Sequence, residues 1–404
     1  MTAELSQKTI DIVKATVPAL EAHGLDITRA MYVRLFRDEE IRDLFNQSHH
    51  GDSGSQPRAL ADAILAYARN IENLGALAPT VERIAQKHVG LQILPEHYPY
   101  VGKALLGAIG DVLGNAATPE ILAAWGEAYW FLADILIGRE DELYSEIEAS
   151  PGGWKGWRDF RIVEKTPESA VITSFLLEPV DGGPVIDHKP GQYLTFSIDV
   201  PGHGTLKRNY SISAAPNGRT YRISVKCEPG GIASGWLHDS ADPGTVLKVA
   251  PPAGEFVLAG EPSRPVVLLS GGVGLTPMVS MLETIAKGSA KKPVPVHYVH
   301  GAINGATHAM GERVRRLASQ TGASTTIFYE RPRAEDRKGQ HYDAEGRISM
   351  DWLARNTPID KADFYICGPK PFLRTFVSGL AAAGVPDDRI HYEFFGPADE
   401  LLAA

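Results

Sequence analysis

The chain changes character at Ser150-Pro151-Gly152-Gly153-Trp154-Lys155-Gly156-Trp157. Upstream of this stretch, apolar residues recur with the spacing of amphipathic helices. Downstream, short alternating strands come first and strand–helix alternation follows. Glycines and a proline end both kinds of pattern here, which is typical of a boundary between separately packed parts. We therefore predict an all-α part upstream and two further parts downstream.

The bulk composition agrees with several domains in one chain. A length of 404 residues exceeds one ordinary core, and the net charge of -9 argues against nucleic acid or an anionic membrane as partner. The only cysteines, Cys227 and Cys367, exclude a disulfide framework and suit a reducing compartment. No apolar run approaches the ~20 residues of a membrane span, and the first residues lack the apolar segment of a secretion signal. We therefore expect a cytoplasmic protein without integral membrane contact.

The upstream part is expected to hold several amphipathic helices. A polar loop separates the first stripe from a helix that begins near Pro57, a residue suited to a first helical turn. Two more helices are expected around Val101–Leu113 and Pro119–Leu136. The apolar stripes of the first three helices are formed by Leu25, Thr28, Tyr32 and Leu35, then by Gln56, Leu60, Ala63, Tyr67 and Ile71, and then by Val81, Ile84, Ala85 and His88.

The downstream part changes its strand pattern near Arg264. Before that residue, closely spaced strands and one short helix, Ala233–His238, predict a small antiparallel barrel; these strands are Phe160–Val163, Val171–Leu176, Tyr193–Ser197 and Tyr221–Val225. After it, apolar strands alternate with helices, which predicts a parallel sheet covered on both faces; these strands are Val266–Ser270, Val294–His300, Thr325–Tyr329 and Phe364–Cys367.

The clearest motif is Ser270-Gly271-Gly272-Val273-Gly274-Leu275-Thr276-Pro277. A buried strand runs directly into glycines, after which Thr276 is expected to cap a helix and Pro277 to start it. Glycines let a backbone approach a pyrophosphate, and the helix N-terminus adds amide donors. The alternative is a tight strand-to-helix turn without a ligand, because the motif is not the plain G-x-G-x-x-G fingerprint.

A second glycine-bearing turn, Cys367-Gly368-Pro369, ends another strand of the same sheet. Ligands bind at the carboxyl ends of parallel strands, so the two turns could bracket one nicotinamide dinucleotide. Without that context, a buried cysteine is usually a core residue.

Two motifs of the barrel could bind an anionic group such as a diphosphate. In Arg208-Asn209-Tyr210-Ser211, strand alternation places Arg208 and Tyr210 on one face. An arginine fork suits a diphosphate, and a tyrosine ring can lie against a flat ring system. Gly230-Gly231-Ile232-Ala233-Ser234 opens a short helix and offers a second anion-binding terminus. Each motif alone also fits an ordinary strand or turn.

Together and in this order, the four motifs resemble the ferredoxin-reductase-like flavoenzymes. The resemblance implies an FAD-binding Greek-key barrel over residues 155–260 and a parallel α/β NAD(P)H-binding domain over residues 261–404. His391–Pro397 resembles the family's C-terminal segment, which packs an aromatic residue near the flavin. The residues implied to bind FAD or NAD(P)H are Tyr193, Arg208, Asn209, Tyr210, Ser211, Gly231, Ser234, Gly271, Gly272, Val273, Gly274, Leu275, Thr276, Pro277, Cys367, Gly368, Pro369, Phe394, Phe395, Gly396 and Pro397.

In the helical part, His88 stands on an apolar stripe, where a histidine is either a core residue or a metal ligand. A metal-bound histidine usually donates its other N–H to a partner, and Tyr98 and the pair Arg139-Glu140 are candidates. Tyr32 also lies on an apolar stripe. A buried phenol needs a partner, which a bound diatomic ligand could supply.

This set resembles a globin, and the resemblance implies a haem b domain over residues 1–147. His88 matches the proximal iron ligand and Phe45 the residue that wedges the haem, whereas Tyr32, Gln56 and Leu60 match the distal residues of bacterial globins. A globin fused to such a reductase resembles the flavohaemoglobins, which are bacterial nitric oxide dioxygenases. The chain departs from them in having Met31 where an aromatic residue is frequent, and in the length of the loop before Gln56.

The resemblance implies that NAD(P)H reduces FAD, that FAD passes single electrons to the haem iron, and that the haem converts NO and O2 to nitrate. Tyr98 and Glu140 would make His88 more electron-donating. Lys87 and Glu393 would pair near the haem–flavin gap. The alternatives are an oxygen- or NO-binding globin sensor and an NAD(P)H-dependent flavin or ferric reductase.

Finer expectations concern ligands. NADH is favoured over NADPH because no arginine immediately follows Val294–His300 to meet a 2′-phosphate. A distal haem pocket lined by Met31, Phe45, Leu60 and Ile64 is expected to admit an apolar or azole ligand. We expect a monomer with O2 and NO as substrates.

Overall fold

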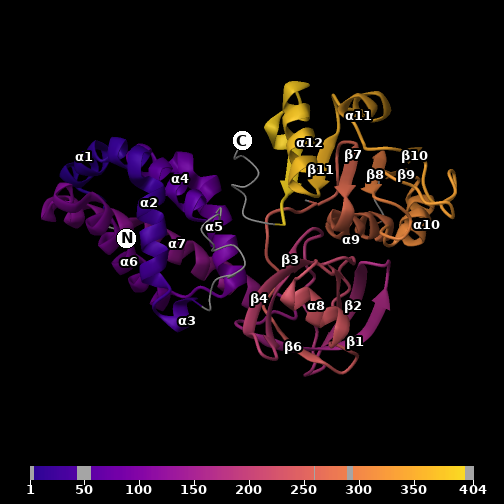
Figure 1. Cartoon of the computed structure of the whole chain (residues 1–404), viewed down its shortest axis with the longest axis horizontal. Coiled ribbons are helices and arrows are strands. Elements are labelled where there is room, and N and C mark those ends of the chain that lie inside the picture. Colours follow the sequence, from indigo (N-terminus) through magenta and orange to yellow (C-terminus); the bar gives the residue numbers. More distant parts are fainter. Residues whose placement is uncertain (1–3, 43–55, 259, 289–293, 396–404) are drawn as a thin grey trace. The chain divides into compact units, whose positions relative to one another are not determined.

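The computed structural model describes residues 4–42, 56–258, 260–288 and 294–395 (Figure 1). Residue contacts divide the chain into two compact units. The first extends to Ala149, and the second takes up nearly all of the chain from Ser150 onward. The division falls at the start of the stretch where the hydrophobic pattern of the sequence changes.

The first unit is helical over its described residues. Its α2 packs against α4 and α6, and its α7 packs against α1, α5 and α6. A proline occupies one of the first two positions in each of α2, α4, α5, α6 and α7. It costs no hydrogen bond there, because the N–H groups of the first helical turn have no acceptor within the helix. The helices are α1 (Gln7–Ala15), α2 (Val17–Leu35), α3 (Glu39–Arg42), α4 (Gln56–Arg69), α5 (Ala78–Leu91), α6 (Tyr98–Leu113) and α7 (Pro119–Ala149).

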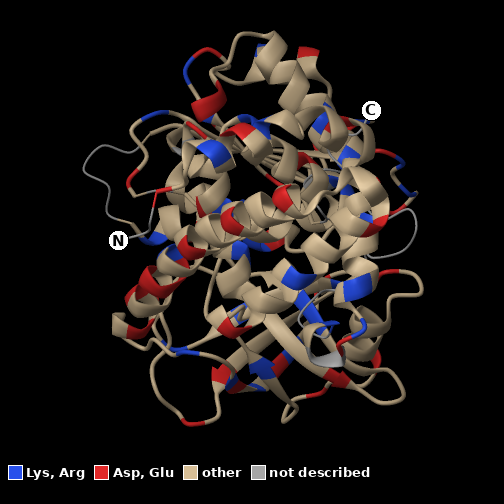
Figure 2. Ribbon diagram, turned by 90° about the vertical axis from the view of Figure 1, so that its left-hand side faces the viewer, with Lys and Arg blue, Asp and Glu red and all other residues tan. Residues whose placement is uncertain are grey.

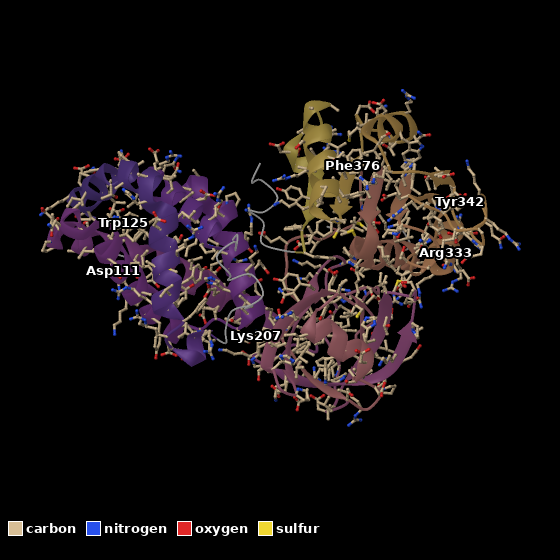
Figure 3. The ribbon with its side chains drawn as sticks, viewed as in Figure 1. Asp111, Trp125, Lys207, Arg333, Tyr342 and Phe376 are labelled. Atoms are coloured by element: carbon tan, nitrogen blue, oxygen red, sulfur yellow. The ribbon has the colours of Figure 1, made fainter. Side chains whose placement is uncertain are left out.

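Helix α7 continues past Leu136, where the sequence pattern predicted its end. The buried indole N–H of Trp125 on this helix donates a 3.2 Å hydrogen bond to Thr16 (Figure 3). An 18-residue window of α7 has a mean hydropathy of 1.3, so among the described residues one helix does have the length and apolarity to cross a membrane, contrary to expectation. One such helix is weak evidence of a membrane span; 28% of this window is buried, and α7 packs against three other helices.

The second unit begins with an antiparallel sheet in the strand order β4-β3-β6-β1-β2-β5. A bridge between Ile212 and Ile223 joins the chain after β4 to β5, so the sheet closes into the predicted barrel. Phe160 and Ile162 alternate inward along β1 and are fully buried. The elements are β1 (Arg158–Pro167), β2 (Ile172–Pro179), β3 (Tyr193–Val200), β4 (Gly204–Ser211), β5 (Tyr221–Lys226), α8 (Ile232–Asp239) and β6 (Val246–Val249).

The rest of this unit is a parallel sheet in the order β10-β9-β8-β7-β11-β12. Helices α9 and α10 lie on one face, and α11 and α12, with the buried Phe376, lie on the other (Figures 1 and 3). The strands are β7 (Val266–Gly271), β8 (Val296–Ala302), β9 (Ser324–Tyr329), β10 (Ala344–Glu345), β11 (Asp363–Cys367) and β12 (Ile390–Glu393). The helices are α9 (Leu275–Lys287), α10 (Gly311–Thr321), α11 (Met350–Asn356) and α12 (Lys370–Ala382).

The strand order reverses between β7 and β11, because β8 and β9 lie on one side of β7 and β11 and β12 on the other. Such a switch point opens a crevice at the carboxyl ends of the strands, where ligands bind. Both glycine-bearing turns of the sequence follow these two strands. The strands β6, β10 and β12 were not expected from the sequence, because two to four residues are too short for a period of two to be recognised.

Charged residues of both signs are interspersed on the face shown in Figure 2. The exposed pair Arg34–Asp111, 2.7 Å apart, is an example from the helical unit. Exposed pairs of this kind contribute about 0–1 kcal/mol, so they affect solubility more than folding.

Candidate functional site

His88 is held by two residues from other helices. Its Nδ1 lies 2.7 Å from Oε1 of Glu140 on α7 and 3.1 Å from the phenol oxygen of Tyr98 at the start of α6. The Tyr98 hydroxyl also donates a 2.6 Å hydrogen bond to the same Oε1. Burial, reinforced by Glu140, holds the pKa of Tyr98 far above its usual range, so this phenol stays a donor. Glu140 therefore accepts one hydrogen bond from the Tyr98 hydroxyl and a second from the Nδ1–H of His88.

Two further residues, Tyr129 and Arg139, lie close to Tyr98 and Glu140 along the chain or by contact. The hydroxyl of Tyr129 donates a 2.6 Å hydrogen bond to the carbonyl of Tyr98 and so fixes the backbone from which Tyr98 projects. The expectation that Arg139 serves His88 together with Glu140 is wrong. Arg139 binds Glu82 at 2.7 Å instead, because consecutive residues of a helix point about 100° apart.

The residues around His88 fit a haem. With Nδ1 engaged, Nε2 is the nitrogen left for iron, and no described residue hydrogen-bonds to it. The side chain is 30% exposed, so it is accessible to a ligand. The neighbouring cluster includes the buried Ile93 and Leu136 and the partly buried Ile84, an apolar surface that suits a macrocycle.

The expected distal residues come from α2 and α4, which pack together. Tyr32, Leu60 and Ile64 are partly buried against the core cluster that contains Met31, and Met31 itself is only 2% exposed. The backbone of Gln56 begins α4, but its side chain, like Phe45, lies outside the described residues.

The sequence did not predict a hydrogen bond that joins these two helices. The buried hydroxyl of Thr28, one turn before Tyr32, donates a 2.7 Å hydrogen bond to the carbonyl of Pro57. The bond joins α2 to the first turn of α4, which carries Gln56. Threonine on an apolar stripe was the only sequence signal that could have indicated it.

In the barrel, the expected flavin-binding residues share strand β4. Arg208 and Tyr210 are partly buried and Asn209 between them is exposed, as the alternation predicts. The Tyr210 ring lies 5.6 Å from that of Phe196, and burial raises the pKa of Tyr210 to about 12. Ser211 is buried at the end of the strand.

Tyr193 opens β3 beside a glycine. A Cβ at Gly254 would lie 2.9 Å from the Tyr193 ring, and the φ of Gly254 is +110°, so only glycine suits this position. The Tyr193 ring thereby lies close to this backbone, on the same sheet as Arg208 and Tyr210.

The loop before α8 leaves backbone amides available to bind an anion. Ser234 does not project outward: its Oγ accepts a 3.2 Å hydrogen bond from the Glu228 N–H and donates to the Gly231 carbonyl at 3.4 Å. Gly231 is the N-cap and α8 has no side-chain cap, so the first amides of the helix are open to an anion. Ser234 therefore shapes the turn, and the amides at the start of α8 have no side-chain cap.

The glycine turn after β7 and the Cys367 turn after β11 are in direct contact. A Cβ at Gly274 would collide with the carbonyl oxygen of Cys367 and lie 2.8 Å from the Gly368 nitrogen. Cys367 is fully buried, and burial raises the pKa of its thiol, so it acts as a packed residue at the carboxyl end of β11. Pro369 is the N-cap of α12. The structure thus brings both predicted nicotinamide motifs to one place.

The expectation that Thr276 caps the helix is wrong. A tight turn at Gly272–Gly274 already redirects the chain, so α9 begins at Leu275, and the Thr276 hydroxyl donates to the Val273 carbonyl at 3.1 Å. Pro277 lies in the first helical turn, two residues after the start. The N-cap, Gly274, has no side-chain hydrogen bond, which leaves amides for a pyrophosphate.

The C-terminal segment forms a strand that the sequence did not reveal. Strand β12 pairs with β11, with Glu393 opposite Cys367. The Glu393 carboxylate adds to the effect of burial in raising the pKa values of Cys367 and Tyr193. Phe394 follows and is half-buried, and Phe395 is 46% exposed. Gly396 and Pro397 lie outside the described residues.

The roles of the site residues, the apolar or azole ligand and the monomeric state remain predictions, and so do two finer expectations. Lys87 is on α5 of the first unit and Glu393 belongs to the second, so their pairing is untested. The preference for NADH relied on the absence of an arginine directly after β8. The fold brings the backbone of Arg331 to this loop, where its backbone N–H donates a 2.8 Å hydrogen bond to the carbonyl of Ile303.

Comparison with known proteins agrees with this division. A globin model matches residues 29–136, an oxidoreductase FAD-binding domain matches residues 159–258, and an oxidoreductase NAD-binding domain matches residues 268–378. A flavohemoprotein of Xylella fastidiosa is 55% identical over 406 residues, covering 100% of both chains. One from Rhizobium meliloti is 49% identical, covering 97% of this chain and 98% of the relative.

Two solved structures extend the comparison. The flavohemoglobin of Malassezia yamatoensis, with bound FAD and heme, has a TM-score of 0.85 at 26% identity, covering 98% of this chain and 100% of that one. The FAD/NAD-binding domain of a nitric oxide dioxygenase from Vibrio cholerae has a TM-score of 0.54 at 39% identity, covering 59% of this chain and 99% of that one. The chain therefore belongs to the flavohemoproteins, oxidoreductases in which a haem-binding globin is fused to an FAD- and NAD-binding reductase.

Proposed function

We propose that this flavohemoprotein is a nitric oxide dioxygenase, which uses electrons from NADH to convert NO and O2 to nitrate. The observation that carries the proposal is the hydrogen bonding of His88 to the buried Glu140 in a globin fused to a reductase. A carboxylate on Nδ1 makes Nε2 a stronger donor to iron, in the direction of oxygen-activating haem proteins. The name of the Vibrio cholerae protein, a nitric oxide dioxygenase, also supports the proposal.

The following residue roles are part of this proposal; the placements above support them except for Gln56, whose side chain lies outside the described residues. When bound, the haem supplies gas binding and one-electron chemistry, and FAD divides the electron pair of the nicotinamide. His88 would hold the iron, with Tyr98 and Glu140 polarising it, and Tyr32 would donate a hydrogen bond to the distal ligand, with help from Gln56. In the reductase, Arg208 and Tyr210 would bind FAD, and the two turns at Gly274 and Gly368 would bind NAD(P)H.

The domain limits are part of the proposal. We assign haem binding to residues 1–147, FAD binding to residues 155–260 and NAD(P)H binding to residues 261–404. Limited proteolysis in the stretch Ser150–Trp157 tests the first limit, since it should release a fragment that retains haem.

The activity is tested by mixing the reduced, O2-equilibrated holoprotein with NO in a stopped-flow instrument. We expect nitrate in about equal amount to the NO consumed, and with NADH present about one NADH oxidised for two NO, because each turnover needs one electron. Reversible NO binding without nitrate would favour a gas sensor. NADH-driven reduction of ferric chelates without NO consumption would favour a flavin or ferric reductase.

A further inference from the structure

One face of α9 is fastened to three consecutive residues of the barrel. The Ser280 hydroxyl donates a 2.8 Å hydrogen bond to the carbonyl of Ala214, and Oε2 of Glu283 accepts a 3.0 Å hydrogen bond from the N–H of Ala215. Lys287 donates to the Pro216 carbonyl at 3.3 Å. Positions 280, 283 and 287 share one helical face. We call these bonds the α9–barrel contact.

Glu283 is the charged centre of this contact. Its Oε1 accepts hydrogen bonds of 3.0 Å from Arg222 on β5 and of 3.0 Å from Arg313 on α10. The side chains of Glu283 and Arg222 are only 11% and 10% exposed. Burial works to raise the pKa of Glu283, but the two arginines and the Ala215 N–H outweigh it and hold the pKa below its usual value. Removing one partner would leave a buried charge uncompensated.

Further bonds stiffen the barrel side of the contact. Arg222 donates from Nε to the Ser213 hydroxyl at 3.2 Å and from Nη2 to the Ser213 carbonyl. The buried His188 donates a 3.0 Å hydrogen bond to the carbonyl of Ala214, and lies 3.4 Å from the Ser280 hydroxyl. Residues 213–216 are thus bound from both sides and have little freedom to shift.

Each side of the α9–barrel contact is close along the chain to a different cofactor motif. Helix α9 begins directly after Gly274 of the nicotinamide turn, and Glu283 follows about 12 Å along its axis at 1.5 Å per residue. On the barrel side, Ala214 follows Ser211, the last residue of the Arg208–Ser211 motif, by three positions. A rigid helix and a short bound segment therefore connect the turn at Gly274 to the strand end at Ser211.

We propose that Ser280, Glu283 and Arg222 are positioning residues that set the distance and angle between nicotinamide and flavin for hydride transfer. Hydride transfer requires the reacting atoms within about 3–3.5 Å, and small misplacements cost large factors in rate. The contact does not touch either cofactor motif itself, so its loss should impair geometry before it impairs nucleotide affinity. The inference rests on NAD(P)H reducing the flavin and is independent of what the haem does with NO.

The test is anaerobic stopped-flow reduction of the FAD in full-length holoprotein by NADH, in the wild type and in Glu283→Gln. The amide keeps the shape of the side chain and removes its charge. We expect the limiting rate of flavin reduction to fall at least tenfold, while the NADH concentration for half-maximal rate changes less than about threefold. The long-wavelength charge-transfer absorbance between NADH and oxidised FAD should weaken, because it requires the two rings to stack.

A milder variant and a matched control keep the result interpretable. Ser280→Ala removes only one oxygen atom and should slow flavin reduction in the same direction, by less. Asp360→Asn changes an exposed carboxylate of the same domain and should leave both the rate and the charge-transfer band unchanged. A Glu283→Gln protein with full FAD, a normal charge-transfer band and a wild-type rate would overturn the proposal. So would variants whose slower reduction is explained entirely by loss of FAD. Failure of NO turnover alone would leave the anaerobic result intact and would concern the proposed dioxygenase activity.

Discussion

Oε1 of Glu140 accepts hydrogen bonds from both His88 and Tyr98, at 2.7 Å and 2.6 Å, while Oε2 is buried with no hydrogen-bond partner among the described residues. All the donors that compensate this carboxylate therefore act through one oxygen atom. A buried carboxylate that accepts both hydrogen bonds through one oxygen atom polarises its donors strongly, because little solvent is present to screen its charge. The electron density on His88 should depend directly on the charge of Glu140.

Replacing that charge should raise the reduction potential of the haem. Glu140→Gln removes a hydrogen bond to a charged group, worth roughly 1.5–3 kcal/mol. For a one-electron couple, this corresponds to about 60–130 mV upward. Spectroelectrochemical titration of the holoprotein measures the shift. Glu142→Gln, on the same helix but exposed and paired with Arg139, is the control and should leave the potential unchanged. An unchanged potential in Glu140→Gln would exclude the polarising role.

Tyr32→Phe should weaken O2 binding. The substitution removes one hydrogen-bond donor to a ligand that carries partial negative charge, a loss of roughly 1.5–3 kcal/mol. We expect O2 to dissociate about tenfold faster or more, as measured by stopped-flow displacement with CO. Tyr67→Phe is the matched control: its hydroxyl donates to the Ala128 carbonyl in the core, so stability should fall by about 1 kcal/mol and the O2 off-rate should stay unchanged. An equal off-rate in wild type and Tyr32→Phe removes Tyr32 from the distal role.

Gly274→Ala should damage nicotinamide binding by a steric route. The new Cβ would collide with the Cys367 carbonyl and crowd the Gly368 nitrogen, both backbone atoms that cannot rotate away. The two turns would be pushed apart, so we expect at least a tenfold loss of NADH affinity, measured by equilibrium titration, with FAD content retained. Gly110→Ala, in an open part of α6, should bind NADH normally and gain about 0.5–1 kcal/mol of stability. Normal NADH affinity in Gly274→Ala would mean that the turn does not hold the dinucleotide.

His188 should make stability depend on pH. Burial lowers its pKa to about 4, against about 6.5 in an unfolded chain. Between these values the unfolded chain binds more protons than the folded one, so the free energy of unfolding falls as pH falls from 6.5 to 4. The full shift corresponds to roughly 3 kcal/mol. Denaturant titrations across this range should show a flatter dependence for His188→Gln, whereas the exposed His203→Gln should follow the wild type. Parallel curves for wild type and His188→Gln would contradict the assignment.

The sequence by itself determined the layout of the chain. The change of hydrophobic period at Ser150–Trp157 coincides with the division between the two units, and the motif at Ser270–Pro277 does follow a buried strand. These features were readable because strand and helix periods are local: each is carried by residues within one or two turns of one another.

Only the tertiary structure decided which distant residues meet. Glu140 reaches His88 across 52 positions while its neighbour Arg139 does not, because the rotation of α7 against α5 selects one residue of each helical turn. Gly274 must be glycine because β7 and β11 are adjacent in the sheet, which brings the Cys367 carbonyl against it. Glu283 finds Arg222 across 61 positions only after the barrel and α9 have packed together. Helix rotation, sheet order and domain packing are set by the summed fit of many side chains, and no local pattern of residues encodes that sum.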